Sequence, residues 1–260
     1  MRHVRIFLGA TVVFTMAVAV TADAQTPPAP RARARRPAPP KGYLSINGGA
    51  QLARTDFQTN VEFPYTREQG EFDASYEAPA APALDVGAGV RIWQRLAVGA
   101  AVTYTQVKGL AAVDARVPHP FSFGADRTLD DSVPDLFRAE TAVHIQAAWF
   151  APVAERVSVS IFGGPTIFRV EQDIITGLDF EETYPFDDVT LDEARIARRE
   201  DTAIGFHVGA DVMYRMTRSV GVGAVARYSR GTLTVATDGA QQADLTAGGL
   251  LLSGGIRWFF

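Results

Sequence analysis

Charged and titratable residues recur at every second position of several segments whose alternate positions are apolar. Because side chains alternate between the two faces of a β-strand, these residues should share one face of a sheet. Groups of both signs gathered there could pair with one another, or line a narrow pore. Glu140 and Asp211 are the candidate partners for the arginines. The residues concerned are Arg91, Glu140, His144, His207, Asp211, Arg215, Arg227 and Arg257.

Catalysis needs a nucleophile, a base and an orienting group within hydrogen-bond reach of one another. His207 and Asp211 lie four residues apart, which is roughly 13 Å along a strand and too far for such a pair. His144 belongs to a segment two strands away from His207, and His119 falls in an expected loop. Spacing therefore assembles no Ser-His-Asp arrangement. We expect no enzyme active site and no cofactor.

Carboxylates crowd the stretch 171–201, which holds 11 acidic and three basic residues. Clustered carboxylates can hold Ca²⁺ or Mg²⁺, which makes Asp187, Asp188, Asp192 and Glu193 weak candidates for metal ligands. Their spacing matches no dedicated calcium-loop motif. A solvated acidic loop is the favoured interpretation.

The elements that would position these groups are strands. Residues 243–260 place Leu250, Leu252, Ile256 and Trp258 on one face, with Arg257 on the other. An apolar face opposite a small or polar one predicts a half-buried strand. Eight segments share this period: 43–57, 82–93, 96–107, 137–150, 156–172, 202–216, 220–237 and 243–260.

The connections between these segments alternate in length. Short turns are expected around 94–95, 152–155 and 217–219, and a short link at 238–242. Long loops are expected at 58–81, 108–136 and 173–201. Transmembrane β-barrels of the outer membrane have short periplasmic turns and longer external loops. Both ends of the barrel segment should then lie on the rim of short turns.

Aromatic residues gather near the ends of the predicted strands. Such positions predict two aromatic girdles at membrane interfaces. A soluble barrel or sandwich would instead put its apolar face inside and its charges outside, so the mixed polar face favours lipid outside and a polar lumen. The girdle at the short-turn level comprises Tyr43, Trp93, Trp149, Tyr214, Trp258 and Phe260, and Tyr104, Phe168 and Tyr228 mark the other level.

The N-terminal region reads as an export signal. Two arginines near Met1 precede the apolar run 6–20, and Ala22-Asp23-Ala24 supplies a small-residue cleavage pattern. This predicts a signal peptide over 1–24, cut between Ala24 and Gln25. Residues 25–42 hold six prolines and five basic residues, which predicts an extended periplasmic leader. The barrel domain should cover 43–260.

Composition limits the remaining classes. The formal net charge is −4, and most of the acidic excess follows Gly42, which argues against a nucleic-acid partner. The chain has no cysteine, so it has neither disulfides nor thiolate metal sites. No stretch after Gly42 has the ~18 consecutive apolar residues of a membrane helix. A membrane-spanning fold would have to use strands.

From Tyr43 to Phe260 the chain resembles small outer-membrane barrels of the OmpA/OmpX/OmpW kind. The signal peptide, the alternating connections, the girdles and the ending Gly-Gly-Ile-Arg-Trp-Phe-Phe260 carry this resemblance. It implies an all-β, eight-stranded antiparallel up-and-down transmembrane barrel in the cell outer membrane. It also implies contact with outer-membrane lipid and lipopolysaccharide, and reading of the last strand by the barrel-assembly machinery. The chain departs from OmpA itself, because no C-terminal peptidoglycan-binding domain follows.

The function expected from these features is that of a monomeric structural or surface-interaction protein. Its lumen would be filled by polar side chains, and its long loops would meet the surroundings. The alternative is a narrow channel for small molecules, apolar ones included. A lipid-modifying barrel enzyme is the third and least favoured possibility.

Overall fold

The computed structural model describes residues 40–52, 55–236 and 242–260. The expected signal peptide, its cleavage site between Ala24 and Gln25, and nearly all of the leader lie outside these residues. The described residues contain no helix long and apolar enough to cross a membrane.

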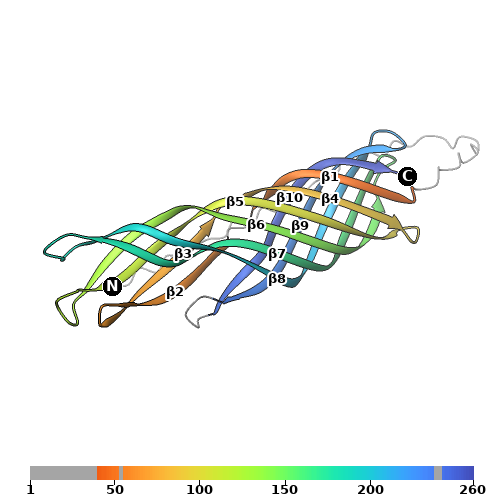
Figure 1. The fold of residues 1–260 in the computed structure, drawn as a ribbon. Helices are drawn as coiled ribbons and strands as arrows, with labels where there is room; N and C mark the ends of the chain where they lie inside the picture. Colours follow the sequence, from red (N-terminus) through yellow and green to blue (C-terminus); the bar gives the residue numbers. More distant parts are fainter. Residues whose placement is uncertain (1–39, 53–54, 237–241) are drawn as a thin grey trace, which may run out of the picture. The chain divides into compact units, whose positions relative to one another are not determined.

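Ten antiparallel strands make up the described fold (Figure 1). Eight of them form a closed ring, in which β1 pairs with β4 on one side and with β10 on the other. The expected all-β, eight-stranded up-and-down barrel is thus confirmed. The strands are β1 (Gly42–Gln51), β2 (Thr55–Tyr65), β3 (Glu68–Ala78), β4 (Ala81–Arg91), β5 (Leu96–Pro118), β6 (Asp126–Pro152), β7 (Val157–Glu182), β8 (Val189–Arg215), β9 (Val220–Ala236) and β10 (Gln242–Phe259).

Closure joins the first and last strands in continuous register, from Tyr43 opposite Phe259 to Gln51 opposite Leu251. At the short-turn rim the backbone N–H of Gly42 donates to the carbonyl oxygen of Phe260, at 2.8 Å. A closed ladder leaves no strand edge unpaired over this part of the barrel.

The expectation of three long loops is wrong. The stretch 58–81 is largely the hairpin of β2 and β3, which pairs with the outer half of β5. The other two are extensions of β5 and β6, and of β7 and β8, beyond the ring (Figure 1). Short connections, 119–125 and 183–188, join these long strands.

The strand β5 shows why these stretches do not look like the rest of the barrel. In its first half Leu96 and Val98 are exposed and Thr103 is buried. In its second half Val113 is buried and Asp114 is exposed. The period of two persists, but the apolar side turns from outward to inward.

The hairpins beyond the ring therefore enclose an apolar core of their own. Phe72, Phe168, Ile175, Leu136 and Leu245 are among its most buried side chains. Packing of such residues, more than strand propensity, stabilises hairpins that would be marginal alone. We call this part of the molecule the extension.

The barrel interior as a candidate functional site

The alternation of side chains along the ring strands brings charged residues into the barrel. Of the eight predicted interior residues, Glu140, His144, His207, Asp211, Arg227 and Arg257 are all under 9% exposed. Arg91 and Arg215 end β4 and β8 and are half-buried at the short-turn mouth. All eight side chains lie on the interior face of their strands.

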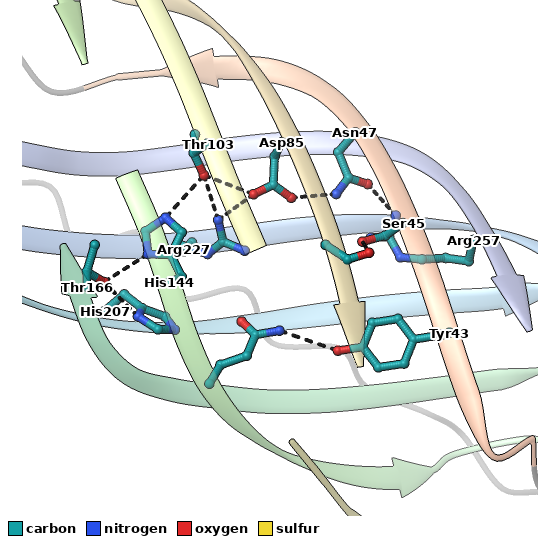
Figure 2. A network of polar contacts seen from close by, with 12 residues as sticks. Tyr43, Ser45, Asn47, Asp85, Thr103, His144, Thr166, His207, Arg227 and Arg257 are labelled. Carbon is teal, nitrogen blue, oxygen red and sulfur yellow. Dashed lines mark hydrogen bonds and ion pairs between the residues drawn. The ribbon is translucent and has the colours of Figure 1, made fainter. Parts of the chain in front are cut away.

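One ion pair lies at the centre of the polar layer (Figure 2). The guanidinium of Arg227 on β9 pairs with the carboxylate of Asp85 on β4, across the barrel. Asp85 also accepts hydrogen bonds from Asn47 Nδ2, at 2.7 Å, and from Thr103 Oγ1, at 2.9 Å. A buried carboxylate with this many partners is satisfied as an anion. The prediction omitted Asp85, although it lies on the polar face of its segment.

The second and third ion pairs lie at different levels. Arg257 pairs with Asp211 at 3.2 Å and also donates to Asn47 Oδ1, so one expected acid has an arginine partner. Glu140, the other expected acid, pairs with none of the four arginines. Its Oε2 lies 3.6 Å from Nη2 of Arg138. The prediction omitted Arg138, although Arg138 lies on the same face of β6 as Glu140.

The two interior histidines lie closer together than their strands suggested. The rings of His144 and His207 have centroids 4.7 Å apart. Thr166 on β7 lies between them, with its Oγ1 2.8 Å from Nδ1 of His144 and 2.9 Å from Nδ1 of His207. A hydroxyl beside imidazole has the atoms of a nucleophile and a base. Thr166 is 0% exposed, however, and a substrate has no access to it.

The free volume in the polar layer is small. A cavity of about 20 Å³ lies among Asn47, Asp85, Gln146, Asp211 and Arg257. Such a space can hold about one water molecule. Side chains therefore fill this level of the lumen, as is usual for a barrel of eight strands.

Two of the expected girdle residues face inward instead. Tyr43 points into the lumen, where its hydroxyl accepts a hydrogen bond from Gln146 Nε2 at 3.3 Å (Figure 2). Phe168 belongs to the apolar core of the extension. The alternation of side chains explains both positions. At Tyr43, for example, the next residue, Leu44, faces outward, so Tyr43 faces inward. The other girdle residues at the short-turn end are exposed: Trp93, Trp149, Tyr214, Trp258 and Phe260.

The candidate metal ligands do not converge. Asp187 and Asp188 lie in the turn after β7, while Asp192 and Glu193 lie along β8. Among the described residues, no group of three or more His, Asp or Glu side chains could hold a metal ion. Apart from the turn at 183–188, the acidic stretch is strand rather than loop, so most of its carboxylates are spread along a ladder.

Two carboxylates of the extension have perturbed acidities of opposite sign. Hydrogen bonds from Arg198 lower the pKa of Asp173. A hydrogen bond with Asp130 raises the pKa of Asp114, helped by the negative charges of Asp130 and Asp73. The register explains the second case, because Asp73, Asp114 and Asp130 are direct neighbours on adjacent strands.

Among known proteins, this chain is similar to solved structures only. No family model and no curated protein matches this sequence. The solved structures to which it is similar include outer-membrane proteins. Neisserial surface protein A is 15% identical, with 84% of this chain and 97% of that chain covered and a TM-score of 0.41. OprG from Pseudomonas aeruginosa is 9% identical, with 86% and 98% covered and a TM-score of 0.42.

A third structure of this group is Ail, the attachment invasion locus protein of Yersinia pestis. It is 11% identical, with 84% of this chain and 99% of that chain covered and a TM-score of 0.34. With TM-scores below 0.5, these likenesses carry no argument about this chain. The function of this chain has to be sought in its own residues.

Proposed function

We propose that this chain is an integral outer-membrane protein with a sealed barrel and an external extension, acting in envelope structure or surface interaction. Support comes first from the belt of apolar side chains on the outside of the ring. In water such a continuous belt would be a severe liability, whereas lipid accommodates it. The belt includes Leu44, Ile46, Leu84, Val86, Val90, Val98, Val102, Val143, Ile145, Ile161, Ile167, Ile204, Val208, Val212, Val222, Leu250, Leu252 and Ile256, all at least 39% exposed.

The reversal of polarity along β5 supports the same interpretation. Apolar residues face outward from Leu96 to Tyr104, and acidic or basic residues face outward at Asp114 and Arg116. A strand that leaves hydrocarbon for water should change its outer face in this way. The extension then stands outside the cell, because the short turns of such barrels face the periplasm.

The filled interior is the observation that carries the sealed-barrel proposal. The ion pairs of Arg227 with Asp85 and Arg257 with Asp211 span the polar layer, and the apolar core of the extension lies above it. To conduct ions, the barrel would have to open a path through both the polar layer and the apolar core. Contacts outside the membrane would therefore be made by the extension, and a narrow channel is the less favoured alternative.

This proposal implies an export route, an assembly partner and a lipid environment for the chain. The signal peptide would deliver the chain to the periplasm, and β10 would be read by the barrel-assembly machinery. Outer-membrane lipid and lipopolysaccharide would surround the belt, and the barrel would act as a monomer. Catalysis forms no part of the proposal, since Thr166 and the two histidines are closed off from any substrate.

Planar-bilayer recording of the purified, folded protein tests the sealed barrel. We expect no conductance above that of the lipid alone. Regular conductance steps would contradict the sealed barrel and favour the channel. Turnover of labelled phospholipid by the same preparation would instead favour a lipid-modifying enzyme. A shift in gel mobility on boiling should accompany each recording, to show that the barrel was folded.

A further inference from the structure

The short-turn mouth of the barrel carries an arrangement of cations that the sealed lumen does not need. Arg91 and Arg215 end β4 and β8, which lie opposite each other in the ring order. Lys41 precedes β1 at the same rim. These three cations border one cavity of about 20 Å³, and none of the described residues bordering it is acidic.

Aromatic rings hold both arginines in place. The guanidinium carbon of Arg91 lies 4.7 Å from the ring centroid of Phe150 on β6. The guanidinium carbon of Arg215 lies 5.3 Å from the ring centroid of Phe259 on β10. A guanidinium stacked on a ring keeps the N–H groups at its edge free to bind an acceptor. The rings therefore orient the arginines without neutralising them.

Most of the hydrogen-bonding capacity of these arginines is unused within the described residues. Arg91 donates from Nη1 to the carbonyl oxygen of Gln94, at 3.1 Å. Arg215 has a buried Nε without a hydrogen-bond partner there. Neither arginine forms an ion pair with a described carboxylate, in contrast to Arg227 and Arg257 deeper in the barrel. Like charges brought together in this way repel unless an anion lies between them.

From this geometry we infer that the mouth is a binding site for a small oxyanion of the phosphate or carboxylate class. Arginine forks match the planar or tetrahedral oxygens of these groups, and two forks from opposite strands can contact one anion. Tyr43, Phe150, Met213 and Phe259 border the same cavity and belong to a mainly apolar cluster. This apolar part of the lining limits the water around the anion and strengthens its attraction to the cations.

The test uses the full chain, folded in a non-ionic sugar detergent, and inorganic phosphate as the probe. Binding is followed by ³¹P line broadening at constant ionic strength, with chloride as the balancing anion. We expect saturable binding, and a loss of affinity of about tenfold or more in the double variant Arg91→Gln/Arg215→Gln. The matched control is Arg218→Gln, since Arg218 is an exposed arginine of the same rim that does not border the cavity.

Acetate competition separates the two ligand classes. Displacement of phosphate by equimolar acetate indicates a carboxylate site, and resistance to it indicates a phosphate site. The single variants Arg91→Lys and Arg215→Lys keep the charge but lose the fork, and should weaken binding even if the double variant fails to fold. Native-like phosphate affinity in the folded double variant or in both lysine variants, or no saturable binding by the native chain, would overturn the inference.

This site concerns the isolated barrel in solution. The orientation of this mouth toward the periplasm rests on the proposed function. Phosphate binding by the protein in detergent is independent of that function. A native chain that binds phosphate yet conducts in bilayers would overturn only the sealed barrel. A sealed barrel without phosphate binding would overturn only the anion site.

Discussion

Individual residues decide how the interior tolerates charge. Arg227 and Asp85 have side-chain exposures of 4% and 2%, so each depends on the other in place of water. Removing one member of a buried pair leaves an uncompensated charge, which costs more than the intact pair contributes. The same holds, more weakly, for Arg257 and Asp211, which lie nearer the mouth.

Arg227→Met should therefore lower the free energy of unfolding by about 3–5 kcal/mol, because Asp85 would be left buried and unpaired. Urea unfolding in lipid vesicles measures this. The double variant with Asp85→Asn should recover part of the loss. Arg230→Gln is the control, as Arg230 is exposed on the same strand. Equal stability of Arg227→Met and Arg230→Gln would contradict the role assigned to the pair.

At the scale of elements, closure depends on backbone contact between β1 and β10. A Cβ added at Gly255 would collide with the carbonyl oxygen of Ile46 and approach Asn47. A Cβ at the adjacent Gly254, on the outer face, would meet its nearest atom only at 3.6 Å. These two glycines form a matched pair for testing the seam.

We expect Gly255→Ala to reduce the fraction of folded barrel, because β1 and β10 would have to separate locally. Gly254→Ala should fold like the native chain. The mobility difference between unheated and boiled samples on gels reports the folded fraction of each. A native yield for Gly255→Ala, or an equal loss in both variants, would show that the seam does not need this glycine.

The stability of the contact between the β2–β3 hairpin and β5 should depend on pH. Asp73, Asp114 and Asp130 repel when ionised, and the pKa of Asp114 is raised above its ordinary 3.8. Because that pKa is higher in the folded state, the contribution to stability is greatest below pH 3.8 and is lost as the pH rises through the folded-state value.

Hydrogen-exchange protection of the β5 amides around Asp114, corrected for intrinsic rates, should thus fall as the pH rises. Asp114→Asn should flatten this dependence. Glu181→Gln should leave it unchanged, because Glu181 is an exposed residue of β7 that lies opposite Thr190 rather than another acid. A native pH profile in Asp114→Asn would rule out the aspartate row as its cause.

For the molecule as a whole, assembly in the membrane is the property that ring closure controls. Phe260 completes the seam, with its carbonyl oxygen accepting from the N–H groups of Lys41 and Gly42 at 2.7 and 2.8 Å. Its exposed ring also belongs to the proposed aromatic girdle at the short-turn end. Both contacts are lost together if the residue is removed.

Deleting Phe260 should lower the amount of folded protein in the outer membrane while export to the periplasm continues. Fractionation followed by immunoblotting measures both. Phe260→Tyr is the control, since it keeps the backbone contacts and an amphipathic ring. Unchanged outer-membrane levels after the deletion would remove the assembly role of this residue.

Much of the barrel could be derived from the sequence alone. The period of two is a local property of an extended backbone, so the inward position of Arg257 and the outward position of Leu252 follow from the chain itself. The short turns follow from the same pattern, because each interrupts it for only a few residues. The eight strands of the ring and their antiparallel order were predictable for this reason.

The extension and the partners inside the lumen were decided only by the tertiary structure. The stretch 111–117 alternates as regularly as any ring strand, but its charged residues lie on the outer side and its apolar residues on the inner side. The sequence pattern predicts it to be part of the long loop 108–136. Arg227 and Asp85 are 142 residues apart, and the tilt and stagger of the closed strands set which charges meet across the barrel. The same holds for His144 and His207. Strand order places them two strands apart, and only the narrow curvature of an eight-stranded ring brings their rings together.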